Sequence, residues 1–100
     1  MVNKYIDTIS IIRLSMQTVS QETKLPIYRV IAQAMSTAIQ DQLFQENTKL
    51  PPVRILADAL SVTPGTIARA YEVLEKDALI VKRVGDGSYV NAQADLYGKD

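Results

Sequence analysis

The fold of this chain is decided by Ser61-Val-Thr-Pro-Gly-Thr-Ile-Ala-Arg-Ala-Tyr71. Thr63 and Pro64 are typical of the N-cap and first positions of a helix. A threonine hydroxyl at the N-cap can accept a hydrogen bond from a backbone N–H of the first turn, which has no partner within the helix. Proline at the first helical position has no N–H, so no donor is left without a partner there. Just upstream, apolar residues recur at helical spacing: Ile55, Leu56, Ala59 and Leu60. The pattern predicts two helices, over 53–60 and 64–76, joined by a short turn, which is a helix-turn-helix.

The segments on either side of these two helices complete a small domain. Pro26 is expected to begin a helix reaching about Phe44, and Leu50-Pro-Pro52 stops any helix before 53, because a residue preceding proline avoids the α region. Downstream, 79–84 and 88–90 are rich in β-formers around the turn signal Gly85-Asp-Gly87, which predicts a hairpin. The apolar face of the first helix contains Ile27, Ile31, Ala34, Met35, Ala38 and Ile39. Three helices followed by a hairpin form a winged helix.

Residues 1–24 carry a further helical pattern. The apolar residues Tyr5, Ile9, Ile12, Met16 and Val19 follow one another at spacings of four, three, four and three. This helix either packs on the core of its own chain or forms a dimerisation contact. The second interpretation is slightly favoured, because the following domain can fold without the helix. The predicted organisation is a helical extension over 1–24 that ends in a polar linker, a winged helix-turn-helix domain over 25–91, and a tail over 92–100.

Composition narrows the class of protein. Of the 100 residues, 47% are hydrophobic and 22% charged, as in ordinary soluble globular domains. There is no cysteine, which excludes disulfides, thiolate zinc sites and a cysteine nucleophile, and no histidine, which removes the commonest general base and metal ligand. We therefore expect a cytoplasmic protein that is not an enzyme, with no catalytic residues, no cofactor, no metal and no membrane partner. The formal net charge of +0 argues against nucleic-acid binding, although the distribution of charge matters more than its sum.

Several separated motifs resemble the winged-helix domain of the GntR family. They are LPPVRILA over 50–57, VTPGTIARAY over 62–71 and GDGSYV over 85–90, with a Pro-Ile-Tyr at 26–28 like the one that opens the family's first helix. The style of the second motif is most similar to the YtrA-type subfamily. The resemblance covers Pro26 to Val90 and implies that the chain is a mainly α winged helix-turn-helix with a small β-hairpin.

The resemblance also implies a surface for double-stranded DNA. In the family, the arginine matching Arg54 reaches DNA from the first helix of the motif, and the start of the second helix contacts bases and phosphates. The hairpin, called the wing, approaches the minor groove. The expected DNA-binding residues are Lys49, Arg54, Thr63, Pro64, Gly65, Thr66, Arg69, Lys82, Arg83, Gly85, Gly87 and Ser88. Lys82 and Arg83 are neighbours on a strand and point to opposite faces, so at most one can face DNA directly.

Each arginine has a structural alternative. Arg54 could pair with Asp58 one turn later, and Arg69 could pair with Glu72. Thr63 and Thr66 could serve as helix cap alone, and capping by the Thr63 hydroxyl is expected in any case. Gly85 and Gly87 could be turn residues and no more, and Tyr71 and Tyr89 are expected in the core.

The sequence departs from the family pattern at four positions. Pro52 stands where serine is usual, and Gly65 stands where asparagine or arginine often reads a base. Ser61 and Ala78 replace turn glycines, so each is strained if its φ is positive.

The function implied by the resemblance is transcriptional regulation, more often repression, by a homodimer on a palindromic operator. A small-molecule effector is doubtful, because no effector domain is recognisable. Two alternatives stay open: a plasmid or phage DNA-maintenance protein that uses the same domain, and a winged-helix module that binds protein instead of DNA.

Overall fold

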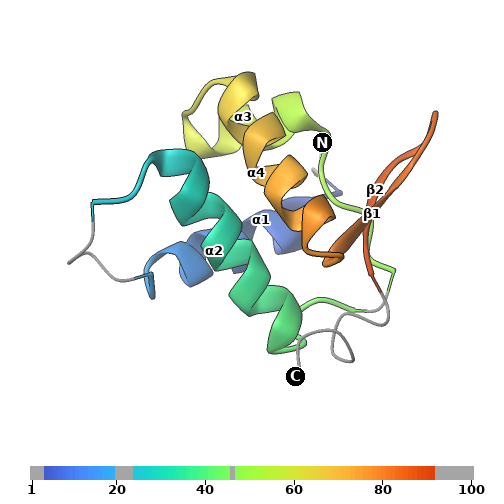
Figure 1. Cartoon of the computed structure of the whole chain (residues 1–100), viewed down its shortest axis with the longest axis horizontal. Coiled ribbons are helices and arrows are strands. Elements are labelled where there is room, and N and C mark those ends of the chain that lie inside the picture. Colours follow the sequence, from blue (N-terminus) through green and yellow to red (C-terminus); the bar gives the residue numbers. More distant parts are fainter. Residues whose placement is uncertain (1–3, 20–23, 46, 92–100) are drawn as a thin grey trace.

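The structure is a computed structural model that describes residues 4–19, 24–45 and 47–91. Four helices precede one antiparallel hairpin (Figure 1). Their bounds are α1 Ile6–Met16, α2 Ile27–Gln40, α3 Val53–Leu60, α4 Pro64–Lys76, β1 Ile80–Arg83 and β2 Gly87–Val90. The expected fold, mainly α with a small β-hairpin and a winged helix-turn-helix, is confirmed. Part of the predicted linker (20–23) and the predicted tail (92–100) lie outside the described residues.

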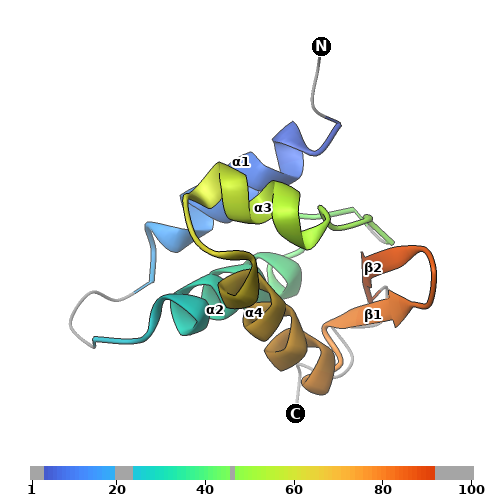
Figure 2. The same cartoon turned by 90° about the horizontal axis from the view of Figure 1, so that it is seen from above.

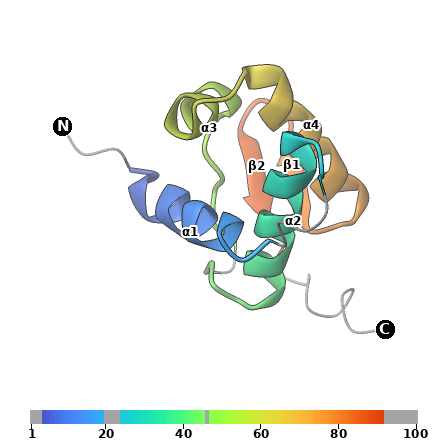
Figure 3. The same cartoon turned by 90° about the vertical axis from the view of Figure 1, so that its left-hand side faces the viewer.

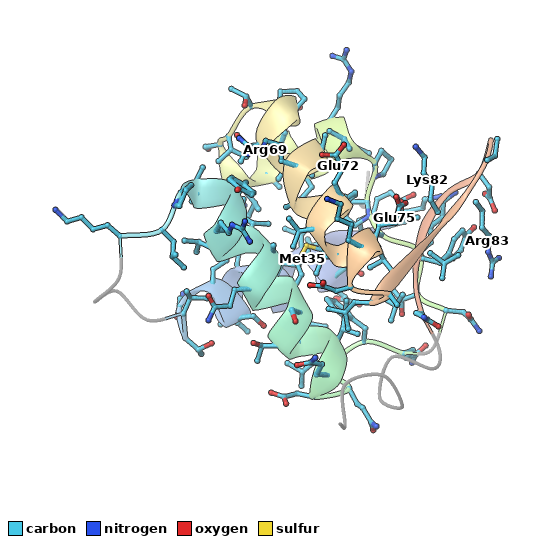
Figure 4. The ribbon with its side chains drawn as sticks, in the orientation of Figure 1. Met35, Arg69, Glu72, Glu75, Lys82 and Arg83 are labelled. Atoms are coloured by element: carbon cyan, nitrogen blue, oxygen red, sulfur yellow. The ribbon has the colours of Figure 1, made fainter. Side chains whose placement is uncertain are left out.

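The helices enclose one hydrophobic core. Helix α2 packs against α1 and α4, and α3 packs against α4, so that α1 and α4 lie on opposite sides of the body (Figure 2). Met35 of α2 lies at the centre with no exposed surface (Figure 4). The other large side chains of the helices that are fully enclosed are Ile12, Ile31, Leu56, Ile67 and Leu74. Because these come from all four helices, α1 belongs to the same core as the helix-turn-helix. Ile27, which was predicted on the apolar face, is 45% exposed.

Helix α1 packs on the core of its own chain, and a contribution to a dimer stays a prediction. Tyr5, Ile9, Ile12 and Val19 are buried within their own chain, and Met16 is partly buried against the same core. A side chain enclosed in this way has little surface left for a second chain. Their position matches the alternative interpretation, packing on their own core, and any dimer contact of α1 has to use its exposed residues.

Three helices end in the same way. Gln42, Ser61 and Ala78 have φ of 61°, 58° and 61°, in the left-handed region that favours glycine. In each case the next residue donates its N–H to a carbonyl five residues back, as in a Schellman motif: Leu43 to Ala38, Val62 to Ala57 and Leu79 to Leu74. The strain expected at Ser61 and Ala78 is therefore present. The turn at Gln42 also corrects the predicted end of α2, which is Gln40 and not Phe44.

We predict that Ala78→Gly raises the free energy of unfolding by about 0.5–1 kcal/mol, because glycine adopts the left-handed conformation without its steric penalty. Urea unfolding followed by circular dichroism measures the change. The matched control is Ala68→Gly, an exposed position inside α4, where glycine should lower stability by about 1 kcal/mol. A loss of stability at both positions would contradict the prediction.

The hairpin is tied to the segment that precedes α3. Its register pairs Ile80 with Val90 and Arg83 with Gly87. On the other edge of β2, the Leu50 N–H donates to the Ser88 carbonyl and the Val90 N–H donates to the Thr48 carbonyl, both at 2.8 Å. These bonds fix the hairpin beside the helix-turn-helix.

No helix within the described ranges is long and apolar enough to cross a membrane.

Helix α4 is joined to the same segment from the other side. The Tyr71 hydroxyl donates to the Pro51 carbonyl at 2.8 Å, a buried bond that satisfies both groups. Burial raises the pKa of this hydroxyl far above its ordinary value, so it stays protonated as a donor. Tyr71 is therefore a core residue, as predicted, and it holds α4 against the chain entering α3.

Candidate nucleic-acid interface

The start of α4 has the predicted backbone but a different cap. Thr63 is extended, with φ −78° and ψ 152°, and Pro64 occupies the first turn. The expected bond from a backbone N–H to the Thr63 hydroxyl is not formed. Instead the Thr63 and Thr66 hydroxyls lie 2.9 Å apart and bond each other, while the Thr66 N–H reaches the Thr63 carbonyl. This corrects the capping prediction and leaves the hydroxyl pair exposed. Figure 3 shows the turn from α3 into α4, which ends at Thr63, and the first turn of α4, which contains Thr66.

Gly65 gives this end of α4 an open surface. Gly65 is exposed, and a Cβ added to it would meet no atom within 4 Å. No positive φ requires glycine at this position. The flat surface allows another molecule to approach the helix backbone closely, but it offers no side chain for reading a base edge.

The two arginines of the helix-turn-helix are exposed, and neither makes the ion pair that was its structural alternative. Arg54 is the second residue of α3. Within the described part of the chain, the single ion pair is Lys49–Asp86, so Arg54 is not bound to Asp58 and Arg69 is not bound to Glu72. The Arg69 guanidinium instead lies 4.0 Å from the centre of the Tyr28 ring, on α2.

The two cations of β1 lie on opposite faces of the hairpin, as the strand geometry predicted. Lys82 is paired with Ser88 and shares the face that leads to the buried Ile80. Arg83 lies on the other face, where its guanidinium is 4.2 Å from the centre of the Tyr89 ring. Figure 4 shows Lys82 on the α4 side of the hairpin and Arg83 on the outer side. Of these two cations, Lys82 therefore faces the space beside α4, the second helix of the helix-turn-helix.

The tip of the hairpin is shaped by two glycines. Gly85 and Gly87 have φ of 78° and 132°. A residue with a side chain would be strained at either value. At Gly87 an added Cβ would also lie 3.2 Å from Lys49 Cε. Both glycines are thus required by the turn, whether or not they contact a ligand. Val84, which sequence reasoning did not single out, is 96% exposed at this tip.

Lys49 belongs to a small network at the base of the tip. Its ammonium lies 3.4 Å from Asp86 Oδ1, and the Tyr89 hydroxyl donates to Asp86 Oδ2 at 2.8 Å. The Tyr89 hydrogen bond, with support from Lys49, lowers the pKa of Asp86, and the bond to Asp86 raises the pKa of Lys49. Sequence reasoning placed Tyr89 in the core and Asp86 only in a turn. Lys49 is far from Asp86 in the sequence, and no local pattern links Asp86 to Tyr89. No sequence pattern therefore indicated this network.

These features define a winged helix-turn-helix protein whose exposed arginines, open helix start and glycine wing suit a nucleic-acid duplex. Helix α3, the starts of α2 and α4, and the tip of the hairpin all lie toward the top of Figure 1. The sequence model described as "Bacterial regulatory proteins, gntR family" matches residues 27–90. The chain belongs to the GntR family, and this region is the family's DNA-binding domain.

Solved structures of similar proteins agree with this assignment. A GntR family transcriptional regulator from Listeria monocytogenes is 35% identical, with a TM-score of 0.66 over 73% of this chain and 66% of its own. YtrA from Sulfolobus acidocaldarius, a GntR-family transcription factor, is 34% identical, with a TM-score of 0.62 over 74% of this chain and 62% of its own. A transcriptional regulator from Oenococcus oeni is 25% identical, with a TM-score of 0.70 over 81% of this chain and 68% of its own.

This chain therefore spans less than two thirds of the length of the Listeria and Sulfolobus chains. Comparison with curated protein sequences gives no match. The similarity to the YtrA type, expected from the recognition-helix motif, is borne out by the Sulfolobus structure.

Proposed function

We propose that this protein is a transcriptional regulator, in the cytoplasm, that binds a palindromic operator as a homodimer and represses by occupying a promoter. The observations that carry the proposal are the exposed Arg54 at the start of α3, without an ion-pair partner in the described structure, and the open start of α4. An arginine fork can bond guanine O6 and N7 or a phosphate in pairs, and the flat surface at Gly65 lets the helix approach the groove.

The two-fold assembly follows from the size of the reading surface. One recognition helix reads only a few base pairs, so a symmetric pair on half-sites about 10 base pairs apart gives a usable operator. In such a complex α4 lies in the major groove and the wings flank it. The exposed residues of α1 are available for the dimer contact, whereas its buried residues support the fold.

The neutral net charge shapes how this protein would bind. Acidic side chains accompany the cations, with Glu72 and Glu75 exposed on α4 and Asp86 on the wing. We therefore expect few phosphate contacts and a shallow dependence of affinity on salt. Most of the affinity for an operator would then come from contacts in the grooves.

The test is selection of binding sites from a randomised duplex pool, followed by fluorescence anisotropy on the selected site across a salt series. Enrichment of a palindrome bound by two chains supports the regulator. Weak, unselective binding that disappears near physiological salt contradicts it and favours the protein-interaction module. Selection of tandem repeats instead of a palindrome favours the DNA-maintenance alternative.

We predict that Asp86→Asn strengthens binding to duplex DNA at low salt. The substitution releases Lys49 from its ion pair, and one added phosphate contact steepens the dependence of log K on log salt by about 0.9. Since the pKa of Asp86 is below its ordinary value, the pair in the wild type persists at pH values below the usual range of an aspartate. Anisotropy titrations at several salt concentrations measure the slope.

The matched control is Asp41→Asn, which makes the same charge change at the exposed end of α2. If both variants change the slope equally, the effect is one of net charge and the release of Lys49 is not its cause.

A further inference from the structure

Tyr28, at the start of α2, contacts two arginines, one on α4 and one next to it on α2. The guanidinium of Arg69, on α4, lies 4.0 Å from the ring centre. The guanidinium of Arg29 lies 5.3 Å from the same ring, and its Nε donates to the Tyr28 hydroxyl at 3.1 Å. The ring is only half-buried and both arginines are exposed, so this cluster lies on the surface between the two helices.

No hydrogen bond or ion pair to another described residue occupies the donors of Arg69. A separation of 4.0 Å places the guanidinium over the ring, within the range of a cation–π contact. A guanidinium carries five N–H donors, and a contact with a ring does not use them as a hydrogen bond to an acceptor would. Glu72 lies one turn further along α4, yet it forms no ion pair with Arg69 in the described structure. The stack therefore orders the side chain without occupying its hydrogen-bonding groups.

We propose that Tyr28 is a positioning residue that holds Arg69, together with Arg29, as a two-arginine grip for a phosphate of the DNA backbone. The inference rests on the proposed function and deepens it, because the family resemblance marked Arg69 but gave no role to Tyr28 or Arg29. The starts of α2 and α4 lie on the same side of the molecule as α3 and the tip of the hairpin (Figure 1). A duplex lying across that side passes over the cluster.

The physical benefit is that the arginine is ordered before binding. A free arginine side chain has many rotamers, and fixing it on a ligand lowers its entropy. A ring that already holds the guanidinium reduces this loss. It also fixes where the cation meets the backbone, which sets the orientation of α4 in the groove. The acidic residues further along α4 make this placement more important, because a displaced helix would bring them toward phosphates.

A double-mutant cycle between Tyr28→Leu and Arg69→Ala tests the inference. Affinity is measured by anisotropy on the selected operator, and folding is checked by urea unfolding of each variant. Tyr28→Leu should weaken binding about two- to fivefold when Arg69 is present and have a clearly smaller effect in the Arg69→Ala background, where only its contact with Arg29 remains to be lost. Tyr28→Phe keeps the ring and should retain the affinity that depends on Arg69. Arg29→Ala should reduce the salt slope by about 0.9.

Two results would overturn the inference. One is an equal loss on Tyr28→Leu in both backgrounds, which indicates a general structural role. The other is full affinity in Tyr28→Leu. Both presuppose that the wild type binds the operator. A wild type that selects no DNA refutes the proposed function itself, so the two failures are distinguishable.

Discussion

Ile12→Ala should lower the free energy of unfolding by about 2–5 kcal/mol, a large part of the stability of a domain of this size. Ile12 has no exposed surface and lies in the cluster that also contains Ile31 and Met35 of α2. Removing its outer carbons leaves a cavity between α1 and α2, because the surrounding helices can close over it only in part. The effect is expected although residues 1–26 lie outside the part of the chain that matches the family.

Urea unfolding at several protein concentrations measures this change. The matched control is Leu14→Ala, on the same helix, where the side chain is 63% exposed and the expected change is within about 0.5 kcal/mol. If the dimer used the buried face of α1 in another conformation, the loss at Ile12 would depend strongly on protein concentration. A small loss at Ile12 would show that α1 is not part of the folded core.

The sequence was most informative where local chemistry dictates the backbone. The bounds of α3 and α4 were predicted as observed, because Pro51 and Pro52 exclude a helix before Val53 and the Thr63-Pro64 pair is typical of a helix start. The glycines at 85 and 87 located the turn of the hairpin, because glycine readily adopts the positive φ that the turn requires. Alternation along β1 correctly separated Lys82 from Arg83, although only the structure showed which of them faces α4.

Features that depend on tertiary contacts were not accessible in this way. The end of α2 was missed because Gln42, a residue without turn preference, adopts a left-handed conformation there. The helical face of α1 was identified, but an apolar stripe is the same whether it meets its own core or a second chain. The ion pair of Lys49 with Asp86 joins residues far apart in sequence. The stacking of Arg69 on Tyr28 depends on how α2 packs against α4, which no local pattern specifies.

Arg54→Ala should weaken operator binding about 10- to 100-fold, which corresponds to about 1–3 kcal/mol for one bidentate arginine contact. The side chain is exposed at the start of α3 and forms no ion pair in the described structure, so its removal should change the free energy of unfolding by less than about 0.5 kcal/mol. A large loss of affinity with unchanged folding is the signature of a contact with the ligand. Anisotropy on the selected operator and on a scrambled duplex measures both affinity and specificity.

The variants Arg54→Lys and Asp58→Ala distinguish the possible roles of this arginine. Lysine keeps the charge but lacks the planar fork, so a base contact is lost on substitution while a single phosphate contact is largely retained. A base contact also predicts that the preference for the operator over the scrambled duplex falls, whereas a phosphate contact predicts a uniform loss and a shallower salt slope. If Arg54 instead served a surface pair with Asp58, both alanine variants would alter stability alike and neither would alter DNA binding. That result would remove the main support for the proposed regulator.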